Sequence, residues 1–126
     1  MQKEDGTTVI DDSYSSNVDG FRNALTFLNS FNGRSKILVT PGIVELGNIS
    51  NDLHHVLGDL ADKVCDMVIL VGKTARTESL RSKIKSDKVH EIDSIYLLKK
   101  KLSELNLTKP VVLIENDLPE HYVARY

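Results

Sequence analysis

The sequence has few of the features that mark secreted, membrane-bound or nucleic-acid-binding proteins. Its single cysteine, Cys65, excludes an internal disulfide framework and lies in an apolar stretch, which favours an inert buried thiol. The longest apolar run, residues 67–71, is far too short to span a bilayer, and the polar first residues resemble no signal peptide. A formal net charge of −2 gives no reason to expect nucleic acid or an anionic membrane as a partner. We therefore expect a cytoplasmic protein.

Length and composition indicate one globular domain. The chain has 126 residues, 40% of them hydrophobic and 27% charged, which suffices for one proper core but not for two. We expect a single domain over residues 1–126. Because a strand pattern begins within the first ten residues, the domain is expected to be excised from a longer polypeptide.

Short apolar runs alternate along the chain with amphipathic segments. Strands are predicted at residues 7–10, 36–40, 67–71, 89–92 and 111–114, and helices at residues 19–31, 50–64, 77–85 and 95–105. This alternation predicts an α/β fold, a Rossmann-like three-layer sandwich with a mostly parallel sheet of five to six strands and helices on both faces. The carboxyl ends of parallel strands share one edge, so ligand binding is expected there.

One strand end, residues 10–17, is densely polar. It reads Ile-Asp-Asp-Ser-Tyr-Ser-Ser-Asn and leads into a predicted helix, for which Asn17 or Asp19 is available as the N-cap; Ser50 is available for the next helix. By themselves these residue types are the usual formers of a turn and a helix cap. Asp11 and Asp12 could also bind a metal, but two adjacent carboxylates without further ligands make a weak site.

Two other segments suggest chemistry that their spacing does not support. Gly72-Lys73-Thr74 follows a strand as a P-loop does, but Met67 stands where that motif requires a glycine. His54 and His55 are adjacent on a predicted helix, so their side chains point about 100° apart and do not easily share a zinc ion.

Residues 11–17 resemble the opening motif of the C-terminal domain of Mur ligases, and most closely that of the D-alanyl-D-alanine-adding group. Asp11, Asp12, Ser13, Tyr14 and Asn17 match the motif, while Ser15 and Val18 depart from it. Further along, Glu45-Leu46-Gly47 and Leu53-His54 match the same group, although Pro41-Gly42 replaces a Gly-Asp pair. The family's sheet also has a sixth, antiparallel strand that the pattern here does not show.

The resemblance implies a set of binding residues and no catalytic residue or metal ligand. In Mur ligases the residue at the position of Asp12 contacts the ATP ribose. The residues implied for ATP binding are Asp12, Ser13, Tyr14 and Asn17, and those implied for substrate binding are Glu45, Asn116 and Asp117.

The implied function is that of a domain that closes over nucleotide and substrate within an ATP-dependent amide ligase of peptidoglycan precursor synthesis. Such a ligase phosphorylates the carboxylate of a UDP-linked muramoyl peptide, and the amine of an amino acid or dipeptide then attacks the acyl phosphate. ATP and Mg²⁺ are held mainly by a central ATPase domain that this chain lacks, so the isolated domain is expected to be inactive.

The end of the chain departs most from the family. Glu115-Asn116-Asp117 replaces a Lys-Gly-Ser-Arg motif, and two acids there are expected to repel a substrate carboxylate. A stand-alone α/β module that binds a nucleotide or a protein partner as a regulator remains the alternative. A receiver-like domain is disfavoured, because the last strand ends without a lysine.

Overall fold

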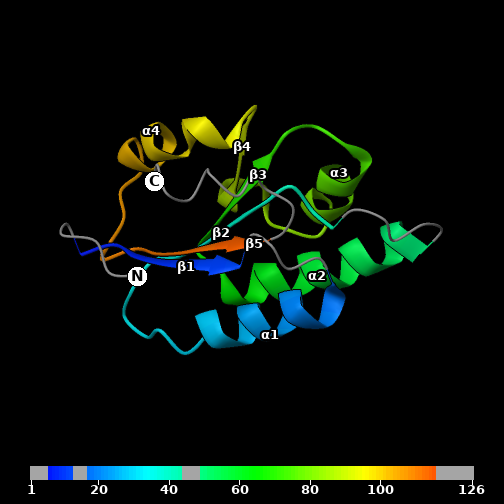
Figure 1. The fold of residues 1–126 in the computed structure, drawn as a ribbon, viewed down its shortest axis with the longest axis horizontal. Helices are drawn as coiled ribbons and strands as arrows, with labels where there is room; N and C mark the ends of the chain where they lie inside the picture. Colours follow the sequence, from blue (N-terminus) through cyan, green and yellow to red (C-terminus); the bar gives the residue numbers. More distant parts are fainter. Residues whose placement is uncertain (1–5, 13–16, 44–48, 116–126) are drawn as a thin grey trace.

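The computed structural model describes residues 6–12, 17–43 and 49–115 of the chain. They form a five-stranded sheet with the order β1-β5-β2-β3-β4, in which all four pairs of neighbouring strands are parallel. The strands are β1 (Thr8–Asp12), β2 (Lys36–Thr40), β3 (Met67–Val71), β4 (Val89–Ile92) and β5 (Val111–Glu115). The predicted parallel α/β fold is thus confirmed. β5, the last strand of the described residues, lies between the edge strand β1 and the middle strand β2 (Figure 1).

Helices cover both faces of the sheet. In the described part of the chain they are α1 (Val18–Leu28), α2 (Ser50–Val64), α3 (Ala75–Arg81) and α4 (Leu98–Ser103), together with the 3₁₀ turns η2 (Ser86–Lys88) and η3 (Ile95–Leu97). Side chains of α1, α2 and α3 share one apolar cluster with the sheet, and those of η3 and α4 share another on the opposite face. The described residues include no helix that is both long and apolar enough to cross a membrane.

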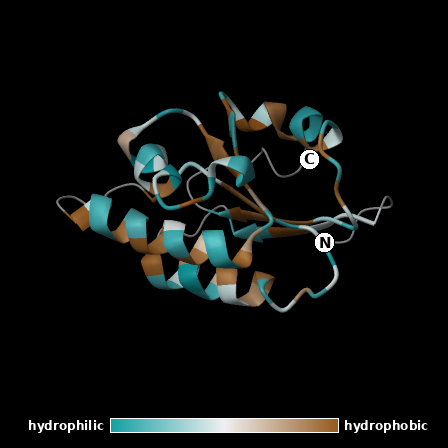
Figure 2. Ribbon diagram, turned by 180° about the vertical axis from the view of Figure 1, so that it is seen from behind, coloured by the Kyte–Doolittle hydropathy of each residue, from teal (hydrophilic) through white to brown (hydrophobic). Residues whose placement is uncertain are grey.

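The apolar core consists of two layers because successive side chains of a strand point to opposite faces. Leu38 and Leu113 face α1 and α2, whereas Val39 and Ile114 face the side of α4. All four are fully buried, and the interior strands β3 and β5 are hydrophobic along most of their length (Figure 2). This is the pattern expected of parallel strands covered on both sides.

The amino-terminal edge of the sheet is tied together by Arg34. Its guanidinium group donates hydrogen bonds to the carbonyl oxygens of Gly6, Lys109 and Pro110 and to the hydroxyl of Thr8, at 2.7 to 3.4 Å. These bonds join the start of β1 to the segment before β5.

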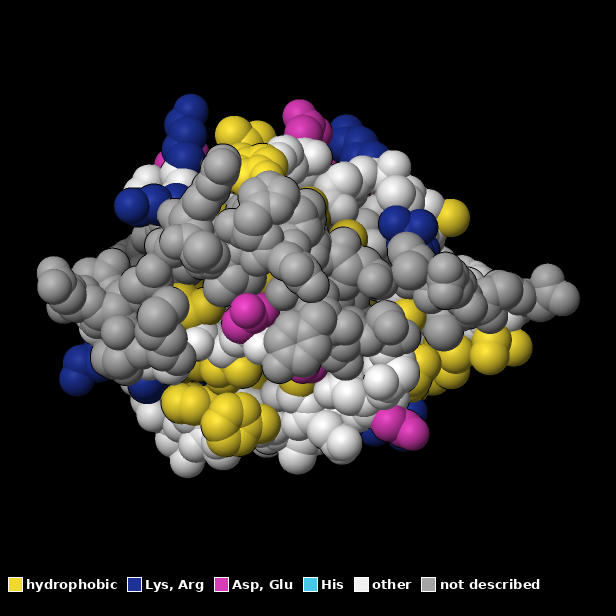
Figure 3. Space-filling view, viewed as in Figure 1, with side chains coloured by type: hydrophobic (Ala, Val, Ile, Leu, Met, Phe, Trp, Pro, Cys, Tyr) yellow, Lys and Arg dark blue, Asp and Glu magenta, His cyan; other side chains and the backbone are white. Residues whose placement is uncertain are grey.

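Hydrophobic side chains also gather on the surface near the end of α1 (Figure 3), where Phe27 is 55% exposed.

Several predicted boundaries were wrong by a few residues. The first strand was expected to end at Ile10, but β1 continues to Asp12 because its ladder with β5 extends that far. The first helix ends at Leu28 rather than at residue 31, and α3 begins at Ala75 rather than at residue 77. Ser50 was expected to be an N-cap, but it is the first residue of α2, whose cap position is held by Ile49 without a side-chain hydrogen bond.

Candidate functional site

The carboxyl edge of the sheet brings the ends of β1, β5 and β2 side by side. Asp12 is the register partner of Glu115, and Ile114 is the partner of Val39 on the other side of β5. The polar end of β1 therefore lies one strand away from the end of β5 and two strands away from the end of β2. This is the convergence that the parallel sheet predicted for the residues after the strands.

Asp12 and Glu115 project from the same face of the sheet. Ile10 and Leu113, two residues earlier in each strand, both pack on the side of α1 and α2, so strand alternation places the two carboxyl groups on that side as well. Asp12 is half-buried, whereas Glu115 is 0% exposed. The buried carboxyl group of Glu115, on the interior strand β5, thus lies beside the carboxyl group of Asp12, on the edge strand β1.

Glu115 is an uncharged acid at neutral pH. Burial, together with the smaller effects of the hydrogen bond with Asp12 and of the negative charge of Asp12, raises the pKa of its carboxyl group to about 10. The protonated carboxyl group can therefore donate a hydrogen bond to the carboxylate of Asp12. Glu115, one of the two acids that were expected to repel a substrate carboxylate, consequently carries no charge, and repulsion by the other, Asp117, stays a prediction.

Asp11 and Asp12 do not form one metal site, because they are successive residues of a strand and their side chains point to opposite faces. Asp11 is exposed on the side of Val9, which belongs to the cluster under α4. Within the part of the chain that the structure describes, no three side chains of the metal-binding types come together.

Asn17 is the N-cap of α1. Its side-chain oxygen accepts a hydrogen bond from the backbone N–H of Gly20 at 2.6 Å, and its backbone is extended, as a cap requires. The alternative cap, Asp19, lies inside the helix. The oxygen of Asn17 is therefore engaged locally, and its side-chain N–H₂ group is what it offers to a ligand.

The remaining residues implied for the site lie outside the described residues. They are Ser13, Tyr14, Glu45, Asn116 and Asp117. Their roles stay predictions.

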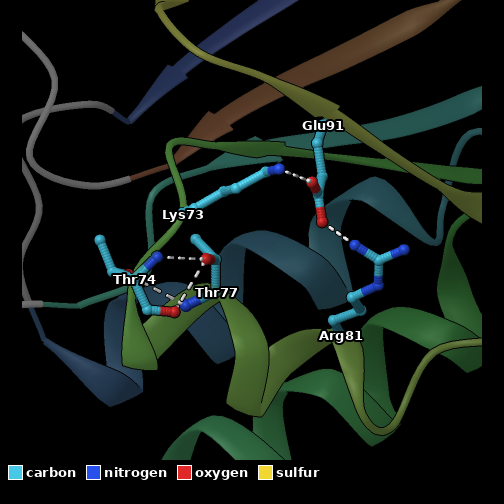
Figure 4. Close-up of polar contacts among 5 residues, drawn as sticks. All are labelled: Lys73, Thr74, Thr77, Arg81 and Glu91. Atoms are coloured by element: carbon cyan, nitrogen blue, oxygen red, sulfur yellow. Dashed lines mark hydrogen bonds and ion pairs between the residues drawn. The ribbon is translucent and has the colours of Figure 1, made fainter.

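The turn after β3 is built to start a helix rather than to cradle a phosphate. Thr74 and Thr77 form a capping box, in which each hydroxyl accepts a hydrogen bond from the other residue's backbone N–H, at 3.2 and 3.0 Å (Figure 4). Lys73 is 76% exposed and reaches Glu91 of β4 at 3.9 Å, and Glu91 also pairs with Arg81 of α3. The amide hydrogens of Thr74 and Thr77 are thus used within the turn.

Glu115 is the residue at this edge that the sequence did not single out as a partner of Asp12. In the sequence Glu115 is marked only as an acid at the end of an apolar run. The strand order is needed to show that this run is an interior strand and that the acid is buried beside β1. His54, which matches the family at Leu53-His54, is fully buried and accepts a hydrogen bond from Ile43, one of the residues that follow β2.

Solved structures of two MurF ligases share this fold. The enzyme from Thermotoga maritima, in complex with ADP, is 25% identical over 92% of this chain, with a TM-score of 0.74. A MurF from Acinetobacter baumannii is 26% identical over 99% of the chain, with a TM-score of 0.71. The chain spans 26% and 29% of these two proteins, about a quarter of their length.

A domain of a putative UDP-N-acetylmuramate:L-alanyl-γ-D-glutamyl-meso-diaminopimelate ligase from Haemophilus ducreyi has the same fold, at 13% identity and a TM-score of 0.63. It is aligned with 94% of this chain over 85% of its own length. No curated protein matches the sequence closely enough to count as a relative. The family model described as the Mur ligase, glutamate ligase domain matches residues 1–114, which is nearly the whole sequence. The chain therefore belongs to the Mur ligase family as a C-terminal domain of the MurF-like kind.

Proposed function

We propose that this chain is the closing domain of an ATP-dependent amide ligase of peptidoglycan precursor synthesis. Its carboxyl edge would face a nucleotide and a UDP-linked muramoyl peptide held by a central ATPase domain of the same polypeptide. The observation that carries the proposal is the pair formed by Asp12 and Glu115, which lies at the ligand-binding edge of a fold shared with a MurF ligase that binds ADP.

The pair suits the recognition of a sugar hydroxyl group. A carboxylate accepts hydrogen bonds from ribose hydroxyls, and a neutral carboxyl group beside it can donate one hydrogen bond to it without adding charge. Glu115 would thereby hold the carboxylate of Asp12 in one orientation while the other lone pairs remain available to the nucleotide. Ser13, Tyr14 and Asn17 would complete the ATP site, and Glu45, Asn116 and Asp117 would contact the incoming amino acid or dipeptide.

The chain supplies positioning rather than bond-making groups. The described residues include no cluster of three metal-binding side chains, and the amide hydrogens of Thr74 and Thr77 after β3 are used in helix capping. Mg²⁺ held by the central domain would offset the phosphate charge. We expect this domain to close on the bound nucleotide and to exclude water, as mobile lids and domains do in other enzymes. By itself it should not hydrolyse ATP.

The test compares Asp12→Ala with Asp11→Ala in the longer polypeptide that carries the domain. Losing a charged hydrogen-bond partner costs about 1.5–3 kcal/mol, so Asp12→Ala should raise the KM for ATP at least about tenfold. Asp11→Ala removes the neighbouring carboxylate from the opposite face and should change it less than about twofold.

Two results would contradict the proposal. Equal ATP affinity and turnover in the Asp12→Ala variant and the wild type would remove Asp12 from the nucleotide site. ATP hydrolysis by the 126-residue chain alone, at the rate of an enzyme, would show that the domain is not merely a closing element. The alternative, a stand-alone regulatory module, is not favoured by the family match. The reading frame of such a module would have no Gly-x-x-x-x-Gly-Lys-Ser/Thr motif upstream of this domain.

A further inference from the structure

Residues 41–43, where the chain leaves β2, are held by side chains from two helices. The backbone N–H of Ile43 donates a hydrogen bond to Nε2 of His54 in α2, at 2.9 Å. Nε of Arg76 in α3 donates to the carbonyl oxygen of Pro41, at 3.3 Å. This short segment lies at the carboxyl edge of the sheet, beside the end of β5. Two helices therefore fix the path of a site-edge segment.

The hydrogen bonds of His54 define the state of its ring. Because Nε2 accepts a hydrogen bond from Ile43, the ring proton must lie on Nδ1. Nδ1 is 2.7 Å from the carbonyl oxygen of Ser50 and 3.1 Å from its hydroxyl, so it has an acceptor for that proton. Burial lowers the pKa of His54, and the nearby charges of Arg76 and His55 lower it as well, against a raising effect of the bond to Ser50. The neutral ring with a proton on Nδ1 satisfies every contact.

Gly42 allows both side chains to approach the segment. Its φ is +88°, and a Cβ atom there would lie 2.9 Å from Nε2 of His54 and 2.8 Å from Cβ of Arg76. No side chain fits between them. The backbone at Gly42 therefore lies close to His54 on one side and to Arg76 on the other. Its N–H donates a hydrogen bond to the hydroxyl of Thr40, at 3.0 Å.

We infer that His54 is a positioning residue, whose neutral ring, together with Arg76, fixes the course of the chain where it leaves β2 toward Glu45. Protonation gives the ring two N–H donors, and the one at Nε2 would then meet the N–H of Ile43 instead of accepting from it. The segment should loosen at acid pH. The consequence of this loosening for substrate binding by Glu45 rests on the proposed function. The contacts of His54 and Arg76 are independent of that proposal.

The experiment uses NMR on the ¹⁵N-labelled 126-residue chain. It measures the ring nitrogen shifts of His54 and the hydrogen exchange of the Ile43 amide between pH 4 and 8. We expect a neutral ring protonated at Nδ1 at pH 7, and a protected Ile43 amide that loses protection together with protonation of the ring. His54→Gln can still accept from Ile43 and does not titrate, so it should keep the protection and remove its dependence on ring protonation.

Two further variants separate positioning from packing. His54→Leu fills the space without an acceptor and should speed exchange at Ile43 at least tenfold. His55→Gln is the matched control on the adjacent position, and exchange at Ile43 should stay within about twofold of the wild type.

A wild-type ring protonated at Nε2, or an Ile43 amide equally protected in His54→Leu, would overturn the inference. If His54→Leu does not fold, the position of the ring proton of His54 in the wild type still tests the inference. No readout uses ATP or ligase turnover, so failure here is distinguishable from failure of Asp12→Ala to weaken ATP binding.

Discussion

Replacing Glu115 by glutamine should stabilise the protein, and increasingly so as the pH rises. Glu115 titrates at 4.5 in an exposed setting, but burial raises the pKa of its carboxyl group in the fold to about 10. Between these values the folded chain holds a proton that the unfolded chain has released, so the free energy of unfolding falls as pH rises. One proton corresponds to about 1.4 kcal/mol per pH unit, or about 3 kcal/mol between pH 4.5 and pH 7.

Glutamine removes this loss without removing the hydrogen bond. Its amide is neutral at all pH values, has nearly the same shape, and can donate to Asp12 as the protonated acid does. The variant should match the wild type near pH 4.5 and exceed it by up to about 3 kcal/mol at pH 7. Urea unfolding of both proteins at pH 5, 6, 7 and 8, followed by circular dichroism, measures the difference.

Titrating groups that do not contact Glu115 cancel in this comparison, because they are common to both proteins. His54, for example, has a lowered pKa, so its contribution is present above 6.5 and declines as pH falls below that value in either protein. Asp11→Asn, on the opposite and exposed face of β1, is the matched control and should follow the wild type. Parallel curves for the wild type and Glu115→Gln from pH 5 to 8 would refute a neutral Glu115.

Three further predictions address the framework. Gly42→Ala should cost at least about 2 kcal/mol in urea unfolding, because positive φ and close side chains both oppose a Cβ atom, whereas Gly72→Ala, also at positive φ but with open space, should cost about 1 kcal/mol. Arg34→Met should lower the free energy of unfolding by about 1–3 kcal/mol, since it leaves several carbonyl oxygens at the amino-terminal edge without their donor; an unchanged unfolding midpoint would contradict this. Cys65 should react with a thiol reagent at pH 8 only as fast as the chain unfolds, because burial raises its pKa to about 12; rapid labelling of the folded chain would show an accessible thiolate.

The fold class could be predicted because its signals are local. β3 is hydrophobic along its whole length and β5 up to its last residue, Glu115, and the stripes on α1 and α2 repeat at helical spacing. The strand order could not be predicted in this way. Nothing in the sequence near β1 indicates that its partner is β5, a hundred residues later, and this pairing is what extends β1 through Asp12.

The candidate site was predictable only in part, for the same reason. Asp12 and Asn17 stand out because they follow an apolar run and match a family motif. Glu115 gains its meaning from burial beside Asp12, and His54 gains its meaning from an Ile43 amide that lies eleven residues earlier in the chain. Contacts between distant elements decide both, and no local pattern encodes them.

The position of β5 between β1 and β2 bears on how the protein is made. Because β5 is inserted between β1 and β2, the first strand has no neighbour in the described sheet until residues 111–115 have been synthesised. A nascent chain on the ribosome would therefore expose the apolar flanks of both strands until β5 has emerged, and chaperone binding should persist for that time. Premature termination shortly before Val111 should leave an aggregation-prone fragment rather than a smaller stable domain.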